Sequence, residues 1–187
     1  MCDITLITGP MFAGKTTELL RQLKVHQEAG QKCVLIKHAS DNRYSAQAEV
    51  VTHDGLTAEA IECNSLTNMP DEDMSQCMAS HVIGIDEGQF FEDLVEFCDT
   101  MACGYKKVIV AGLCNTHERK GFKPIVNLFP FCEKVTRLRA VCKDCSKPAD
   151  FSFRLTNTEE NLIGGSKDYK ALCRECYIFN IGMGVQL

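Results

Sequence analysis

Gly9-Pro10-Met11-Phe12-Ala13-Gly14-Lys15-Thr16 is the stretch of sequence that decides the fold of this chain. It matches the phosphate-binding loop pattern, in which a glycine is followed by four residues and then by Gly-Lys-Ser/Thr. The apolar, β-branched run Ile4–Thr8 precedes it and predicts a strand. Thr17–Leu23 follows it with apolar residues at helical spacing, which predicts a helix. These flanks favour a nucleotide-binding α/β domain over a tight turn that contains two glycines and a lysine by chance.

A loop of this kind binds an anion through its backbone. The N–H groups of the loop and of the first helical turn point inward and surround phosphate oxygens. We therefore expect Lys15 to lie beside the outer phosphates of a triphosphate and the Thr16 hydroxyl to hold Mg²⁺.

Length and composition limit the class of protein. The 187 residues, 45% of them hydrophobic, suit one domain with a small appendage. No apolar run approaches the roughly 20 residues of a membrane span, and Met1-Cys2-Asp3 does not begin a secretory signal. The net charge of −5, without a basic block, argues against nucleic acid as a partner. We expect a cytoplasmic protein that binds neither membrane nor nucleic acid.

The chain contains twelve cysteines. Most of them, such as Cys33 and Cys98, lie inside apolar segments, where cysteine behaves as a small buried hydrophobic residue in a reducing compartment. Four others, discussed below, are paired at short spacing.

Strands and helices alternate along most of the chain. Strands are predicted at 33–37, 81–86, 107–112 and 135–141, helices at 16–29, 91–101 and 124–131, a short strand and turn within 50–63, and irregular chain at 64–76. This alternation predicts a P-loop parallel sheet with helices on both faces. After Val141 paired cysteines and polar residues replace this alternation, which predicts a nucleotide-binding domain at 1–141 and, from those cysteines, a small zinc-binding domain at 142–187.

Two acids follow the predicted strand 81–86, in the sequence Asp86-Glu87-Gly88-Gln89. Ligands of open α/β sheets bind beyond the carboxyl ends of the strands. Asp86 is therefore a candidate second holder of Mg²⁺, and Glu87 is a spare carboxylate that can accept a proton from an attacking hydroxyl or water. A solvated turn of two acids is the alternative, and the phosphate-loop pattern makes it less favoured.

Cys142-x-x-Cys145 and Cys173-x-x-Cys176 form two CxxC pairs. Two such pairs can complete a tetrahedral four-thiolate site, for which Zn²⁺ in a structural role is the default metal. Two disulfides and a redox pair are the alternatives. A metal would fix both ends of the intervening segment 146–172, in which Gly164-Gly165 and Tyr169 suit close packing on a small ligand.

These constellations together resemble the thymidine kinase family of the cellular, bacterial and poxvirus type. The resemblance extends from Ile4 to Tyr177, and the short length resembles that of poxvirus members. Besides the phosphate loop and the cysteine pairs, it rests on segments spread along the chain: Asp41-Asn42-Arg43-Tyr44, Thr52-His53-Asp54, Ile83-Gly84-Ile85-Asp86-Glu87-Gly88-Gln89-Phe90-Phe91 and Ile163-Gly164-Gly165.

The resemblance implies an activity and a set of residues for it. The activity is ATP-dependent phosphorylation of the 5′-hydroxyl of thymidine, and of deoxyuridine, with Glu87 as catalytic base and with Thr16 and Asp86 on the Mg²⁺ side. ATP would contact residues 9–16, Asp41, Asn42, Arg43 and residues 86–89. The nucleoside would contact Met11, Phe90, Leu113, His117, Phe122, Ser152, Glu160, Asn161, Leu162, Ile163, Gly164 and Tyr169. The segment 160–164 corresponds to the family's lasso, which covers the base. A structural zinc, a homotetramer and inhibition by thymidine triphosphate are implied as well.

One departure from the family concerns the base pocket. The family usually has Leu-Asp-Gly-Thr-Phe-Gln-Arg-Lys-Pro-Phe where this chain has Leu113-Cys114-Asn115-Thr116-His117-Glu118-Arg119-Lys120-Gly121-Phe122. His117 thus replaces a stacking phenylalanine with a smaller, titratable ring, unless it is an exposed loop residue. A deoxynucleoside kinase of altered base specificity is therefore an alternative. A nucleic-acid-stimulated ATPase and a zinc-stabilised module that binds nucleotide without turnover are two others.

Overall fold

The computed structural model describes residues 2–40, 49–51, 57–155 and 165–182. Its centre is a six-stranded sheet in the order β5-β2-β6-β7-β1-β8, and every pair of neighbouring strands in it is parallel. The strands are β1 (Asp3–Thr8), β2 (Cys33–His38), β5 (Ile61–Cys63), β6 (Val82–Ile85), β7 (Lys107–Gly112) and β8 (Lys134–Arg137). β3 (Glu49–Val51) and β4 (Thr57–Glu59) form a separate antiparallel pair.

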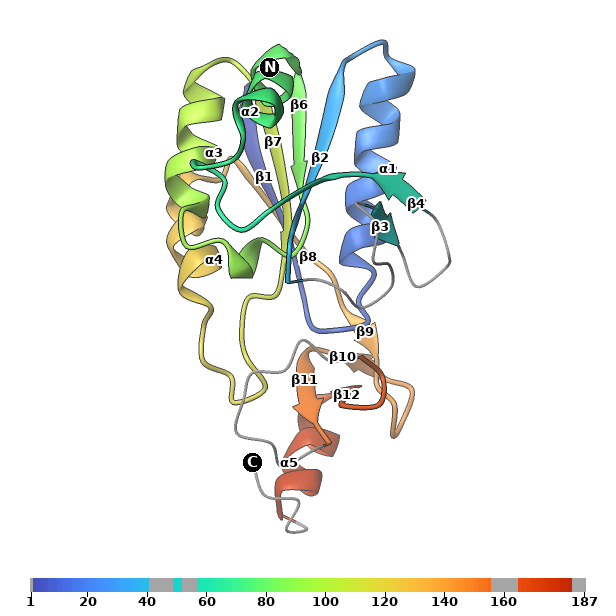
Figure 1. The fold of residues 1–187 in the computed structure, drawn as a ribbon. Coiled ribbons are helices and arrows are strands. Elements are labelled where there is room, and N and C mark those ends of the chain that lie inside the picture. The colour runs from blue at the N-terminus through green and yellow to red at the C-terminus, as the bar shows by residue number, and fades with distance from the viewer. Residues whose placement is uncertain (1, 41–48, 52–56, 156–164, 183–187) are drawn as a thin grey trace.

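Helices cover both faces of the sheet (Figure 1). One face carries α1 (Lys15–Glu28), and the other carries α3 (Leu94–Cys103) and α4 (Lys123–Leu128), with α2 (Asp71–Ala79) beside them. None of the helices that the structure describes is both long and apolar enough to cross a membrane.

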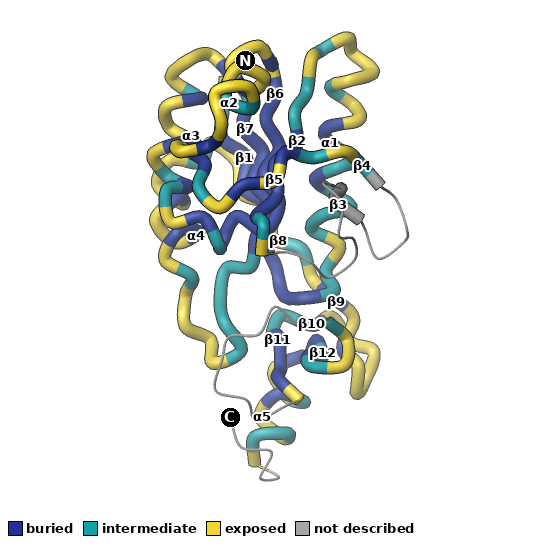
Figure 2. Tube along the Cα trace, in the orientation of Figure 1, coloured by how far each residue is buried: buried dark blue, intermediate teal, exposed yellow. Residues whose placement is uncertain are grey.

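Each central strand divides its side chains between two hydrophobic clusters. In β7, Val108 and Val110 belong to the cluster under α3 and α4, whereas Ile109 and Ala111 belong to the cluster under α1. This is the two-residue alternation of a strand that is buried on both faces. Figure 2 shows the result as a continuous buried band through the sheet. At Gly84, α1 lies so close that a Cβ atom would be 2.7 Å from Cδ1 of Leu23.

A small C-terminal module lies at the carboxyl end of the sheet (Figure 1). It consists of the antiparallel pairs β9 (Ala140–Val141) with β10 (Pro148–Ala149) and β11 (Phe151–Arg154) with β12 (Tyr169–Leu172), followed by α5 (Arg174–Gly182). Its hydrophobic cluster includes Phe153 and Tyr177, and two phosphate-loop residues, Phe12 and Ala13, pack against it.

The predicted P-loop α/β fold is confirmed, and most predicted elements lie within a few residues of their expected bounds. The prediction of irregular chain at 64–76 is wrong, because α2 begins there at Asp71. The signal was present: Pro70 precedes three acids, Asp71-Glu72-Asp73, which favour the first turn of a helix. The single predicted strand 135–141 is also wrong. β8 ends at Arg137 because its partner β1 ends at Thr8, where the phosphate loop begins.

The described structure also accounts for single cysteines. Cys98 is a fully buried residue of α3, and burial raises the pKa of its thiol well above the usual value, as expected of an inert hydrophobic cysteine. Cys33 is only half-buried. The boundary predicted between Val141 and Cys142 stays a prediction, although Ala140 already packs in the C-terminal cluster.

Candidate active site and cysteine cluster

The phosphate loop connects β1 to α1 and has glycine where the backbone requires it. A Cβ atom on Gly9 would lie 2.5 Å from the carbonyl oxygen of Leu138, so a larger residue cannot fit. Gly14 caps α1 in the left-handed region, with φ of 78°. The Lys15 ammonium donates to the carbonyl oxygen of Pro10 at 3.0 Å, which holds this side chain over the loop. The geometry is that of an anion-binding loop at a helix N-terminus.

Thr16 and Asp86 meet beside this loop. The Thr16 hydroxyl lies 3.1 Å from Oδ1 and 3.0 Å from Oδ2 of Asp86, although the two residues are far apart in the sequence. Asp86 is buried directly after β6, and its N–H donates to Ile36 of the neighbouring strand β2 at 2.9 Å. A hydroxyl and a carboxylate side by side provide the hard oxygen donors that Mg²⁺ prefers, so these two residues fit the predicted metal.

Glu87 lies next to this pair, in a buried polar chain. Its exposed fraction is 7%, and its backbone is in the left-handed region with φ of 52°. Oε2 of Glu87 accepts a hydrogen bond of 2.5 Å from Nε2 of Gln89, and Oε1 of Gln89 accepts one of 2.9 Å from the N–H of Leu113. The backbone N–H of Leu113 can only donate, so it must face the amide oxygen of Gln89. The NH₂ group of Gln89 must therefore face the Glu87 carboxylate.

The predicted nucleoside residues that the structure describes come from five segments near the carboxyl edge of the sheet. Met11 is in the phosphate loop, and its N–H donates to the buried Ser152 hydroxyl of β11 at 3.0 Å. Phe90 ends a short 3₁₀ helix, Gly88–Phe90. Leu113, His117 and Phe122 lie in the loop between β7 and α4, and Tyr169 begins β12.

His117 is half-buried, and the centre of its ring is 6.4 Å from that of Tyr169. Burial lowers the pKa of His117 below its ordinary value, and the positive charge of Arg154 lowers it further. The imidazole is therefore mainly neutral at pH 7, and a neutral ring can stack on a base.

Two groups of predicted site residues lie outside the described residues. These are the ATP-side residues Asp41, Asn42 and Arg43 and the lasso residues Glu160, Asn161, Leu162, Ile163 and Gly164. Their roles, like those of the other individual site residues, stay predictions.

The four paired cysteines gather into one cluster in the C-terminal module. The sulfur atoms of Cys142, Cys145, Cys173 and Cys176 all lie within 4.8 Å of one another. Those of Cys145 and Cys173 are 3.6 Å apart, far beyond the roughly 2.05 Å of a disulfide bond, and all twelve cysteines are free thiols. Four thiols converging on one point match the donor set of a structural zinc site, so the cluster is compatible with this metal.

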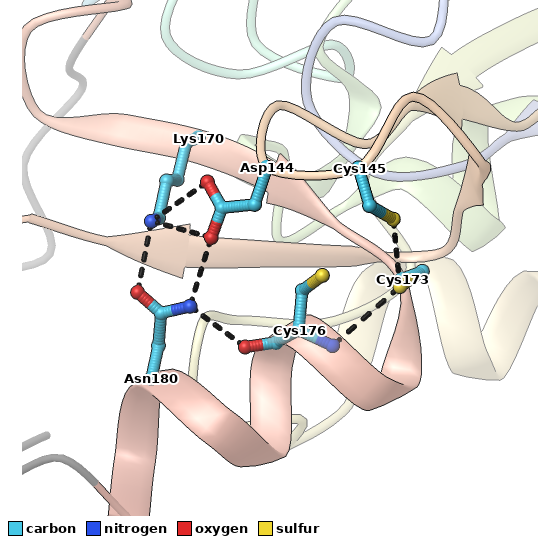
Figure 3. A network of polar contacts seen from close by, with 6 residues as sticks. All are labelled: Asp144, Cys145, Lys170, Cys173, Cys176 and Asn180. Atoms are coloured by element: carbon cyan, nitrogen blue, oxygen red, sulfur yellow. Dashed lines mark hydrogen bonds and ion pairs between the residues drawn. The ribbon is translucent and has the colours of Figure 1, made fainter.

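A polar network surrounds the cluster on one side (Figure 3). The Lys170 ammonium contacts both carboxylate oxygens of Asp144 at 3.1 and 3.0 Å and Oδ1 of Asn180 at 2.9 Å. The Asn180 amide donates to Asp144 at 2.9 Å and to the carbonyl oxygen of Cys176 at 2.7 Å. These three residues connect the first CxxC turn, β12 and α5, and they are called the cluster clamp below.

The sequence interpretation missed the cluster clamp, although signals for it exist. Asp144 stands inside the first CxxC pair. Asn180 follows Cys176 by four residues, a spacing that places Cys176 and Asn180 on one face of a helix. It also missed Lys37, a lysine inside the apolar strand β2 that is 2% exposed and pairs with Glu62 at 3.1 Å.

Comparison with known proteins adds independent findings. The sequence model of the thymidine kinase family matches residues 2–177. The thymidine kinase of Vaccinia virus (strain Western Reserve) is 49% identical over 176 residues, which are 94% of this chain and 96% of the viral protein. That of monkeypox virus is 48% identical over the same shares, and that of Myxoma virus (strain Lausanne) is 49% identical over 95% of this chain and 97% of its own. The chain therefore belongs to the thymidine kinase family.

Proposed function

We propose that this protein transfers the γ-phosphoryl group of ATP to the 5′-hydroxyl of thymidine, and also of deoxyuridine. The observation that carries the proposal is the contact of Thr16 with Asp86 beside the buried Glu87 carboxylate. It supports a triphosphate site and a candidate base at the same edge of the sheet. Family membership and the names of the viral relatives support thymidine as the acceptor.

The phosphate loop supplies binding and charge compensation. Its backbone N–H groups bind the phosphate oxygens, and Lys15 neutralises the outer phosphates. Thr16 and Asp86 would hold the Mg²⁺ that accompanies ATP, and this ion would offset charge on the β- and γ-phosphates. Asp41, Asn42 and Arg43 are assigned to ATP by the family resemblance.

Glu87 orients the acceptor and removes its proton. Its carboxylate accepts a hydrogen bond from the 5′-hydroxyl, aims the oxygen for in-line attack on the γ-phosphorus, and takes the proton as the new P–O bond forms. The hydrogen bond of 2.5 Å from the Gln89 amide holds the carboxylate in one orientation.

The nucleoside is assigned to the side of the site that faces the C-terminal module. By the resemblance, segment 160–164 pairs with the thymine edge through backbone groups, and the polar partners of a buried base make discrimination strong. Zn²⁺ in the four-cysteine cluster would be structural, because four thiolates leave no open coordination position.

A second candidate function differs only in the base. His117 stands where the family usually has phenylalanine, and its half-buried ring lies near Tyr169. A smaller, polar ring favours a wider range of bases than thymine and uracil. Initial rates with thymidine, deoxyuridine, deoxycytidine and deoxyguanosine, each with ATP and Mg²⁺, separate the two candidates.

Further parts of the proposal rest on the family resemblance. We propose a cytoplasmic enzyme that forms a homotetramer and is inhibited by thymidine triphosphate. Analytical ultracentrifugation of the full chain tests the assembly, and inhibition kinetics with thymidine triphosphate test the regulation.

Substitution of the candidate base is the decisive experiment. Glu87→Gln keeps the size and one acceptor oxygen but cannot take a proton, so we expect kcat for thymidine to fall about 10²–10⁴-fold. The KM for ATP should stay within about twofold, because the phosphate loop is unchanged. Transfer of the labelled γ-phosphate of ATP to thymidine measures this.

The exposed Glu92→Gln, in the same segment, is the matched control and should keep wild-type turnover. Near-normal turnover of Glu87→Gln would reject the assignment of Glu87. Release of phosphate that depends on DNA, without transfer to a nucleoside, would instead support a nucleic-acid-stimulated ATPase. Nucleotide binding with neither transfer nor release would support a binding module.

A further inference from the structure

The loop between β7 and α4 is a closed hairpin. Asn115 and Gly121 form an antiparallel bridge, the N–H of Thr116 donates to Lys120 at 2.8 Å, and the N–H of Phe122 donates to Cys114 at 3.0 Å. These internal bonds make residues 113–122, called the nucleoside hairpin below, a unit that shifts as a whole. It carries three of the residues assigned to the nucleoside.

The tip of the nucleoside hairpin contacts Tyr177 of α5. The Tyr177 hydroxyl donates to the carbonyl oxygen of His117 at 2.6 Å. The Arg119 guanidinium lies 5.1 Å from the centre of the Tyr177 ring, which is within the range of a cation–π contact. The backbone of Arg119 is in the left-handed region, with φ of 65°, at the turn that makes this contact possible.

Tyr177 itself is held firmly by the C-terminal module. It is 1% exposed, its N–H donates to Cys173 at 2.9 Å, and it directly follows Cys176. Its ring packs edge-on against Phe153, with centroids 5.6 Å apart, and at a tilt against Phe151, at 5.3 Å. The position of its hydroxyl is therefore set by the C-terminal module, through the backbone of Cys173 and the rings of Phe151 and Phe153.

We propose that Tyr177 is a positioning residue for the nucleoside: its hydroxyl fixes the nucleoside hairpin at the distance from the C-terminal module that the nucleoside pocket requires. The proposal rests on the proposed function and names the contact through which the C-terminal module acts on the nucleoside side of the active site. Without the hydroxyl, the hairpin tip loses its one described side-chain donor from α5, and His117 can shift relative to Tyr169. The partners in this hydrogen bond are Tyr177 and His117, and neither belongs to the phosphate loop.

The test is Tyr177→Phe in the full-length, zinc-replete protein. Phenylalanine keeps the ring packing and removes only the hydrogen-bond donor. A hydrogen bond contributes about 0.5–1.5 kcal/mol, so we expect the Kd and KM for thymidine to rise about 2–12-fold. The KM for ATP should stay within about twofold, and the zinc content should not change. Calorimetry, initial rates and atomic absorption measure these quantities.

Two further variants sharpen the test. Tyr105→Phe makes the same chemical change at a residue that is 88% exposed, and it should behave as the wild type. Arg119→Leu removes the cation over the Tyr177 ring at an exposed position, and it should raise the KM for thymidine about 2–5-fold.

An unchanged Kd for thymidine in Tyr177→Phe, or equal increases in the KM for thymidine and for ATP, would overturn the proposal. Loss of zinc or a large fall in melting temperature would also overturn it, since the role would then be purely structural. The proposed function fails separately if wild type phosphorylates a different nucleoside; a higher KM for that nucleoside in Tyr177→Phe would still support the positioning role.

Discussion

Glu87 holds its carboxylate in a position that is costly for an isolated residue. Its backbone is in the left-handed region, which costs a non-glycine residue about 1–3 kcal/mol, and its side chain is 93% buried. The hydrogen bond from Gln89 offsets part of the burial cost. Residues held in such conformations occur preferentially at functional sites, so the strain at Glu87 agrees with its proposed role as the base.

His117 gives the nucleoside side a dependence on pH. Its pKa is lower in the folded protein than the ordinary value of about 6.5, so it is mainly neutral at pH 6.5 and above and becomes protonated only as the pH falls through this lower pKa. The stability that depends on neutral His117 is likewise present above pH 6.5 and decreases as the pH falls through the folded pKa. Protonation replaces an uncharged stacking ring with a cation that must stay hydrated.

We therefore expect the KM for thymidine to be constant between pH 7 and 8 and to rise severalfold as the pH falls through the lowered pKa of His117. His117→Phe should abolish this rise and lower the KM at all pH values, because phenylalanine stacks without a charge. Initial rates across pH 5.5–8 in both proteins measure the difference. A rise of the same size in His117→Phe would show that another group causes it.

At the residue scale, the identities of many site residues could be predicted from the sequence, but the contacts between these residues could not. The phosphate-loop residues, Asp86, Glu87 and the four cysteines could be selected because each type has a characteristic spacing. The hydrogen bonds from Leu113 to Gln89 and from Gln89 to Glu87 could not be predicted, because Leu113 and Gln89 follow two different, neighbouring strands. Tyr177 was missed for the same reason: its partner, His117, belongs to a distant loop.

Among the elements, the order of the strands assembles the site. β1, β7 and β6 are neighbours in the sheet, and the phosphate loop, the nucleoside hairpin and Asp86-Glu87 follow directly after them. Because the three strands are parallel, their carboxyl ends meet at one edge. Local patterns predicted each strand, but not this order, which depends on crossovers between distant elements. For a related reason, β8 and β9 were predicted as a single strand: the end of β8 is determined by the end of its partner β1.

The cluster clamp should affect how tightly the cysteines bind metal. Asp144, Lys170 and Asn180 connect the three elements that supply or flank the thiols, and such outer contacts typically contribute 10–100-fold to metal affinity. Asn180→Ala removes the contacts to Lys170, Asp144 and the Cys176 carbonyl together. We expect it to bind zinc about 10–100-fold more weakly, as measured by competition with a chromogenic chelator.

The control for this prediction lies in the same module. Glu175→Gln breaks the exposed ion pair with Lys147, at 3.0 Å, on the same helix as Asn180. Exposed pairs contribute little, so its zinc affinity should match that of wild type. Equal affinities for Asn180→Ala and Glu175→Gln would mean that the cluster clamp does not organise the thiols.

In the whole molecule, the phosphate loop lies between two hydrophobic cores. Its strand β1 is buried in the sheet, whereas Phe12 and Ala13 pack against the cluster of the C-terminal module. The hydrogen bond from Met11 to Ser152 is the polar counterpart of this contact. The C-terminal module therefore packs directly against the phosphate loop, and the sequence had predicted Ser152 and Tyr169 of this module beside the nucleoside.

The two sides of the site nevertheless depend on this module to different degrees. On the predicted nucleoside side, the described part of the module includes Ser152 and Tyr169. Its Tyr177 also holds the nucleoside hairpin through a hydrogen bond. On the predicted triphosphate side, the phosphate loop and Asp86 both follow strands of the parallel sheet. Loss of metal should therefore affect nucleoside binding first.

Cys173→Ser tests this asymmetry. It removes one of four thiols, so we expect zinc content and melting temperature to fall and the KM for thymidine to rise at least about fivefold more than the KM for ATP. Cys103→Ser, an exposed free thiol at the end of α3, should leave all four quantities unchanged. An equal rise in both KM values would contradict the asymmetry. It would mean that the contacts of Phe12, Ala13 and Met11 with the module govern the phosphate loop as strongly as Tyr177 governs the nucleoside hairpin.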